Sequence, residues 1–138
     1  MPTADLRQPF RDLQELYDRS PLHRWLGLKV VEQNGGVVVR GRLERVVTVD
    51  GPRQIVHGGV VTALLDIAAT FALIEHTRRD WFTADLRVDF LRFATVGLVE
   101  VSGRVLHVGS SLGRARAELR GEEGDVCAIA SGTWVPMR

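Results

Sequence analysis

The stretch that decides the fold runs from His57 to Ala72 and reads HGGVVTALLDIAATFA. Two glycines open it, and small and branched apolar residues follow almost without interruption. A helix that is apolar all round is normally buried on every side. We therefore expect one long central helix over residues 58–76, ending near Thr77, with the rest of the chain wrapped around it.

Asp66 is the one carboxylate in this run. Burying an ionised carboxylate without a partner is costly, so Asp66 is either neutral and hydrogen-bonded or faces a polar pocket that uses its charge. Gly58 and Gly59 favour the pocket, because free N–H groups at a helix start attract negative charge and glycine permits close approach. The alternative is a structural carboxylate that caps a neighbouring backbone group. A lone acid in a buried helix beside a glycine-rich start is more typical of a functional site.

Composition points to one soluble domain over residues 1–138. The chain is 45% hydrophobic and 25% charged, and its net charge of +1 gives no strong attraction to nucleic acid or to a membrane. Cys127 is the single cysteine, which excludes an intrachain disulfide and fits a reducing compartment, so we expect a cytoplasmic protein. The four histidines show no metal-ligand spacing, and we expect no metal and no cofactor.

Periodicity predicts the remaining elements. Before the central helix, we expect an amphipathic helix over about 4–18, ended by Pro21, and two strands over 26–33 and 37–43. Asn34-Gly35-Gly36 is a hairpin signal between these strands. The segment Val46–Val49 extends or follows the second strand. After the central helix, glycine-bearing turns separate four strands over 83–93, 98–108, 112–120 and 126–135. Short connections favour antiparallel pairing, so we predict an α+β fold with a curved antiparallel sheet of about six strands around the helix.

This order of elements, with His57-Gly58-Gly59 and Asp66 in the central helix, resembles the hotdog-fold acyl-CoA thioesterases, most nearly the phenylacetate-degradation (PaaI-like) type. The resemblance covers about Leu26 to Val135. Its other motifs are Thr83-Ala84-Asp85-Leu86, Phe90-Leu91-Arg92 and the tail Ala128-Ile129-Ala130-Ser131-Gly132-Thr133-Trp134. It implies the hotdog fold and hydrolysis of aryl or fatty acyl-CoA thioesters to free acid and coenzyme A.

In that family the helix carboxylate of one subunit faces the helix N-terminus of its partner. The resemblance therefore implies a homodimer, or a dimer of dimers that forms a homotetramer. Asp66 would be the general base or the nucleophile, the Gly58 N–H would polarise the thioester carbonyl, and Thr83 would assist. His57 is included in the catalytic set, although a structural hydrogen bond to its loop is the stronger expectation.

One position departs from the family pattern. Related enzymes usually carry an amide side chain that holds the attacking water where this chain has Gly51. Gln54 lies in the same loop and is our candidate substitute.

The candidate substrate-binding residues come from four segments. Aromatic side chains can line an acyl pocket, arginines match phosphate geometry, and glycine and serine turns supply backbone donors. On these grounds we select Gly59, Trp81, Phe82, Arg92, Ser110, Ser111 and Arg114. Each has a plainer alternative as a packing glycine, a core or interface aromatic residue, or a solvated surface side chain.

Two other functions stay open. A non-catalytic acyl-CoA-binding module would follow if activity was lost together with the amide at Gly51. A hotdog hydratase or dehydratase would need a histidine facing a carboxylate across the sheet, whereas His57 precedes a glycine pair.

Overall fold

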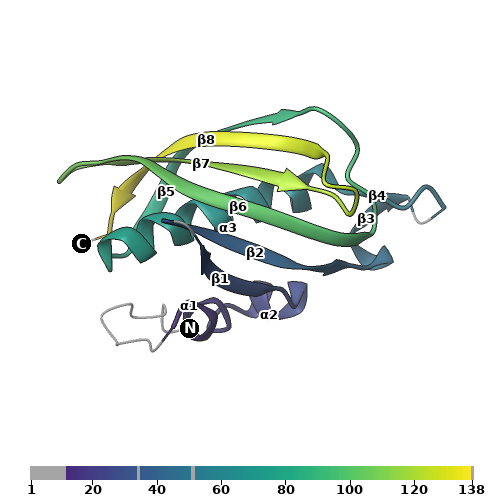
Figure 1. Ribbon diagram of the computed structural model, residues 1–138, viewed down its shortest axis with the longest axis horizontal. Helices are drawn as coiled ribbons and strands as arrows, with labels where there is room; N and C mark the ends of the chain where they lie inside the picture. The colour runs from purple at the N-terminus through teal and green to yellow at the C-terminus, as the bar shows by residue number, and fades with distance from the viewer. Residues whose placement is uncertain (1–11, 34, 51, 138) are drawn as a thin grey trace.

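The computed structural model describes residues 12–33, 35–50 and 52–137. One six-stranded antiparallel sheet curves around the long helix α3 (Gly58–Thr77) (Figure 1). The strands lie in the order β1 (Lys29–Gln33), β2 (Gly36–Leu43), β6 (Gly97–Val108), β7 (Gly113–Arg120), β8 (Val126–Pro136) and β5 (Trp81–Phe90). This architecture confirms the predicted fold class.

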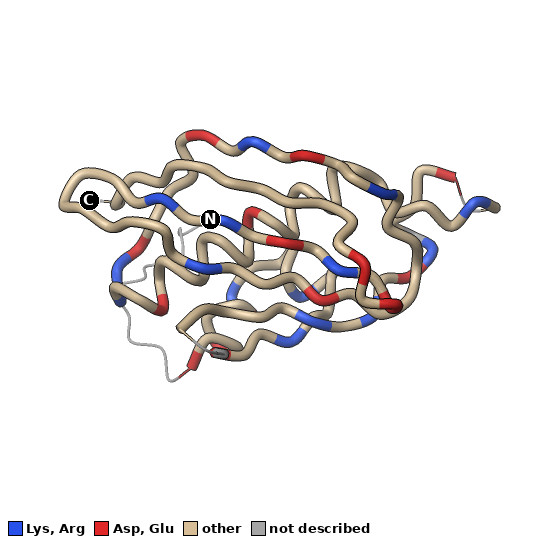
Figure 2. The backbone as a smooth tube through the Cα atoms, turned by 45° about the horizontal axis from the view of Figure 1, so that its top comes forward, with Lys and Arg blue, Asp and Glu red and all other residues tan. Residues whose placement is uncertain are grey.

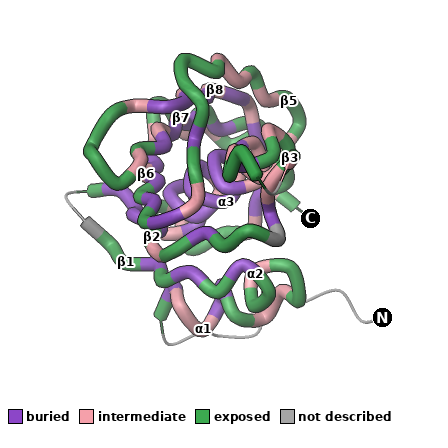
Figure 3. The backbone as a smooth tube through the Cα atoms, turned by 90° about the vertical axis from the view of Figure 1, so that its right-hand side faces the viewer, coloured by how far each residue is buried: buried purple, intermediate pink, exposed green. Residues whose placement is uncertain are grey.

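Helix α3 forms the centre of the hydrophobic core. Figure 3 looks along it and shows its buried residues surrounded by the strands. Leu64, Leu65 and Leu73 are completely buried. β6 approaches the helix closely at Gly103, which has no side chain; a Cβ at this position would overlap the Ala68 carbonyl. By length and composition α3 could cross a membrane, but more than half of its apolar stretch is buried within the fold, as in a core helix.

The N-terminal segment differs from the prediction. Helix α1 (Leu13–Tyr17) lies within the predicted helix over 4–18, of which residues 4–11 fall outside the described residues. Pro21 does not end a helix but opens a second one, α2 (Pro21–Leu26), which is capped by Ser20. Proline suits a first helical turn because the N–H that it lacks would have no helical partner there. The strand predicted from residue 26 consequently starts three residues later, at Lys29.

A small hairpin that was not predicted precedes α3. After a 3₁₀ turn, η1 (Arg45–Val47), strands β3 (Thr48–Asp50) and β4 (Ile55–Val56) pair with each other. The His57 N–H donates to the Val47 carbonyl at 2.8 Å, which fixes the hairpin to the start of α3.

The strand predicted over 83–93 is β5, which runs from Trp81 to Phe90. It ends early because the next two N–H groups, of Leu91 and Arg92, both donate to the Cys127 carbonyl at 2.8 and 3.0 Å. Cys127 itself is buried.

Candidate active site

Asp66 is half-buried in the middle of α3, and its carboxylate is held through one oxygen. Thr83 Oγ1 donates a hydrogen bond of 2.7 Å to Asp66 Oδ1, and Thr70 Oγ1 donates a longer one of 3.5 Å to the same atom. The Thr70 hydroxyl in turn accepts from Trp134 Nε1 at 2.8 Å. Among the described residues, Asp66 Oδ2 has no hydrogen-bond partner, so this oxygen is available to a water molecule or a substrate.

An irregularity in the sheet accompanies the contact between Asp66 and Thr83. Thr83 pairs with Trp134 of β8, and the register of β5 shifts between Thr83 and Asp85. Such bulges bend a strand and re-aim its side chains. The edge strand therefore places a hydroxyl against the carboxylate of the central helix.

The N-terminus of α3 forms a second polar group of atoms. His57 is the N-cap, and its Nδ1 accepts the Gly59 N–H at 2.9 Å. Because Nδ1 is the acceptor, the ring hydrogen of neutral His57 lies on Nε2. The Gly58 N–H is left without a partner in the described part of the chain and is a donor for an incoming oxygen.

Gly58 lies on the wall of a hollow of about 540 Å³. The ring of Phe90 lies beside Gly58, at 3.6 Å from the position that a Cβ on Gly58 would occupy. The hollow lies between the β3–β4 hairpin, the start of α3 and the connection that follows β5. Its lining is Val49, Arg53, Ile55, Val56, Gly58, Val61, Phe90, Leu91, Arg92, Phe93 and Ala94.

The two polar groups are separated within one subunit. Asp66 follows Gly58 by eight residues, which corresponds to about 12 Å along a helix. A base or nucleophile and an oxyanion donor must both lie within about 3 Å of the reacting group. One substrate carbonyl therefore cannot contact both residues of the same subunit.

Gln54, Trp81 and Phe82 form no hydrogen bond with Asp66 or with the start of α3 in the described part of the chain. Gln54 is exposed in the β3–β4 turn with a φ of 57°, and it does not line the hollow. Gly51, the position of the family amide, lies outside the described residues. Trp81 is a buried core residue whose Nε1 donates to Thr77 Oγ1 at 2.8 Å, whereas Phe82 is exposed.

The predicted phosphate-binding residues are divided between two places. Arg92 lines the hollow beside Gly58. Ser110 and Ser111 are exposed at the β6–β7 turn, and Arg114 is exposed on β7, opposite Thr133. None of these three lines the hollow.

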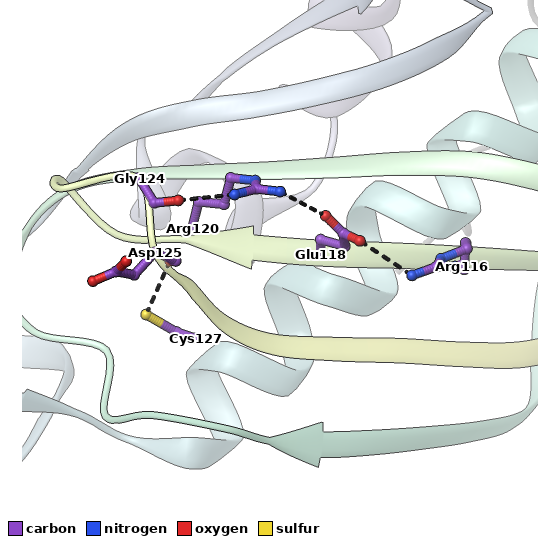
Figure 4. A network of polar contacts seen from close by, with 6 residues as sticks. All are labelled: Arg116, Glu118, Arg120, Gly124, Asp125 and Cys127. Atoms are coloured by element: carbon purple, nitrogen blue, oxygen red, sulfur yellow. Dashed lines mark hydrogen bonds and ion pairs between the residues drawn. The ribbon is translucent and has the colours of Figure 1, made fainter.

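The sheet also carries charges that pair with one another. Arg116 and Arg120 both bind Glu118, at 3.1 and 3.2 Å, and Arg120 also donates to the Gly124 carbonyl at 2.8 Å (Figure 4). Figure 2 shows basic and acidic positions interspersed along the strands.

His23 packs against α3 through Phe71. Its ring stacks on Tyr17 and meets Phe71 edge-on, with centroid distances of 4.6 and 5.9 Å. Burial lowers the pKa of His23, against smaller raising effects from its bond to the Tyr17 carbonyl and from the charges of Asp18 and Asp66.

Sequence reasoning missed Thr70, Trp134, Phe90 and Arg53. Thr70 was detectable, because a residue four positions after Asp66 lies on the same helix face. Phe90 and Trp134 belong to motifs of the family resemblance but were given no role at the site, and Arg53 belongs to none of these motifs. Their contacts depend on which strands are neighbours, which the local sequence does not show.

Comparison with known proteins identifies the family. Residues 53–128, more than half of the chain, match the thioesterase superfamily. The medium/long-chain acyl-CoA thioesterase YigI of Escherichia coli is 31% identical over an alignment of 98 residues that covers 60% of this chain and 63% of that protein.

Two solved structures share the fold. The Escherichia coli PaaI protein from the phenylacetic acid degradation operon superposes with a TM-score of 0.80 at 22% identity, covering 89% of this chain and 88% of that chain. The BH2602 protein of Bacillus halodurans, crystallised with CoA, superposes with a TM-score of 0.78 at 19% identity, covering 86% of this chain and 80% of that chain. The segment that matches the family, residues 53–128, runs from the hollow into β8. The chain therefore belongs to the thioesterase superfamily and has its hotdog fold.

Proposed function

We propose that this protein hydrolyses acyl-CoA thioesters, with an aryl or fatty acyl group, to the free acid and coenzyme A. The observation that carries the proposal is the Asp66 carboxylate, which Thr83 and Thr70 hold at Oδ1 while Oδ2 stays available. The relationship to YigI supports an acyl-CoA substrate. The structural likeness to PaaI is compatible with a PaaI-like subtype, which we include in the proposal.

Asp66 has two possible roles in this reaction. As a general base, Oδ2 removes a proton from the water that attacks the thioester carbonyl carbon. As a nucleophile, Oδ2 attacks that carbon itself and water hydrolyses the resulting anhydride. In both cases the Gly58 N–H donates to the developing oxyanion, the C–S bond breaks, and the departing thiolate of coenzyme A takes up a proton.

We further propose that each active site is shared between two subunits of a homodimer, which can pair into a homotetramer. The separation of about 12 Å between Gly58 and Asp66 along α3 supports this arrangement. β5 supports it as well, because this ten-residue strand lies at the edge of the sheet and edge strands need cover. Asp66 would then meet the partner subunit's Gly58. The buried thiol of Cys127 fits a cytoplasmic location.

A panel of acyl-CoA substrates tests the proposal. The purified protein is incubated with acetyl-, octanoyl-, palmitoyl-, benzoyl- and phenylacetyl-CoA, and the released thiol is trapped with a chromogenic disulfide. We expect release from at least one substrate and its loss in Asp66→Asn. Binding of acyl-CoA without thiol release would refute hydrolysis and favour the non-catalytic binding module.

A further inference from the structure

The hollow beside Gly58 combines an apolar lining with two guanidinium groups. Arg53 and Arg92 are the charged residues of the lining, and they come from different segments, the β3–β4 turn and the connection after β5. Val49, Leu91 and Phe93 expose large apolar surfaces around them, and the Phe93 side chain is 78% exposed. Exposed apolar side chains that gather around a hollow mark a ligand or partner surface.

Both arginines are held by weak surface ion pairs. Arg53 lies 3.4 Å from Asp50, and Arg92 lies 3.4 Å from Asp125. Exposed pairs of this kind contribute little to stability, because water and salt screen them. A phosphate group carries more charge than a carboxylate and accepts two parallel hydrogen bonds from one guanidinium. It can therefore draw either arginine away from its present partner.

We propose that Arg53 and Arg92 bind the phosphate groups of coenzyme A, so that the hollow holds the carrier end of the substrate and not its acyl group. The assignment rests on the proposed function, which places the thioester carbonyl at the Gly58 N–H. The pantetheine arm then leaves the thioester along the apolar lining, and the phosphates follow at the two arginines. The acyl group extends in the other direction, toward Asp66 of the partner subunit.

The assignment chooses between the two places where arginines were predicted to bind phosphate. Arg92 shares the hollow with Gly58, whereas Arg114 lies on β7 and outside it. It also adds Arg53, which carries no motif in the sequence and reaches the hollow because the β3–β4 hairpin is fixed to the start of α3.

Substrate preference provides the first test. We compare kcat/KM for an acyl-CoA with kcat/KM for the N-acetylcysteamine thioester of the same acyl group, which lacks phosphates. Arg53→Gln and Arg92→Gln should each lower the ratio of these two values about tenfold or more, because each removes a charge-assisted hydrogen bond. Arg87→Gln is the matched control: Arg87 lies 3.4 Å from Asp89 and is as exposed as Arg53, at 77% against 73%, but it does not line the hollow.

A binding measurement separates this proposal from the proposed function. Calorimetry with coenzyme A itself, on Asp66→Asn protein, needs no turnover. Adding Arg53→Gln or Arg92→Gln should weaken binding about tenfold or more, and adding Arg87→Gln should not weaken it.

Equal ratios and equal affinities in all three arginine variants would overturn the phosphate assignment, even if the parent protein is an active thioesterase. Conversely, arginine-dependent binding of coenzyme A to a protein that releases no thiol would support the assignment and refute hydrolysis.

Discussion

Thr83 on the edge strand β5 donates a hydrogen bond of 2.7 Å to Asp66 on the central helix α3. This contact joins an edge strand of the sheet to the helix that the sheet surrounds. It fixes the carboxylate through Oδ1 and leaves Oδ2 without a hydrogen-bond partner among the described residues.

Removing this hydroxyl should impair turnover and leave the fold intact. We expect Thr83→Val to lower kcat about ten- to a hundredfold, because a hydrogen bond to a charged group contributes roughly 1.5–3 kcal/mol. Thr83→Ser keeps the donor and should stay within a few-fold of the parent. Steady-state kinetics on the best acyl-CoA substrate checks this, and valine and serine variants of equal activity would contradict it.

Asp66→Asn should lower kcat about a thousandfold, because the amide can neither remove a proton nor attack the thioester. Its carbonyl oxygen can still accept from Thr83, so the melting temperature should change little. Kinetics and thermal unfolding are measured on the same preparation. Near-parental turnover in a folded Asp66→Asn protein would disprove the catalytic assignment.

Two inactive variants should restore activity when their subunits are mixed. Asp66→Asn removes the carboxylate, and Gly58→Pro removes the backbone donor at a first helical turn, where proline is tolerated. Half of the dimers in an equal mixture are mixed, and each of these holds one intact site of two, so about a quarter of parental activity should return.

The control for the mixing experiment is each variant alone, which should stay near background. Subunit exchange is verified with differently tagged chains. A mixture that stays inactive despite exchange would place Asp66 and Gly58 in the same subunit's site, or show that one of them has no catalytic role.

Sedimentation should detect a dimer or a tetramer. The long edge strand β5 is the surface that most needs a partner, and activity should fall on dilution as subunits separate. A folded monomer with full activity per chain would exclude the shared site.

His23 should make stability depend on pH below neutrality. Burial lowers its pKa in the folded state from the ordinary value of 6.5, so the unfolded chain binds more protons as the pH falls. The stability is fully present above pH 6.5 and is lost as the pH falls from there through the folded pKa. We expect a lower melting temperature at pH 5.5 than at pH 7.5, and a smaller difference in His23→Gln.

Two partly buried carboxyls should act in the opposite direction to His23. Burial raises the pKa of Glu75 and of Asp80, so these groups favour the folded state as the pH falls. A pH dependence between 5.5 and 7.5 that is unchanged in His23→Gln would contradict the assignment to His23.

The sequence by itself determined the elements with a strong local pattern. The apolar run of α3, opened by His57 and two glycines, predicts both of its ends, because helix formation and capping depend on neighbouring residues. Strands β6 to β8 begin and end within one residue of their predictions for the same reason. Asp66 was recognisable as a lone charge in a buried helix.

Local pattern was insufficient where it was short or ambiguous. Pro21 is compatible with either the end or the start of a helix, and Ser20 and the packing of His23 make it a start. β3 and β4 have three and two residues, too few for any periodicity.

Only the tertiary structure decided which side chains meet. Thr83 reaches Asp66 because β5 pairs with β8 with a shifted register, and Arg53 joins Arg92 because a short hairpin is fixed beside α3. The separation of Gly58 from Asp66 within one subunit follows from helix geometry, whereas the proposal that a second copy completes the site also rests on the position of the open edge of the sheet. Contacts between distant segments depend on strand order and register, which local sequence patterns do not encode.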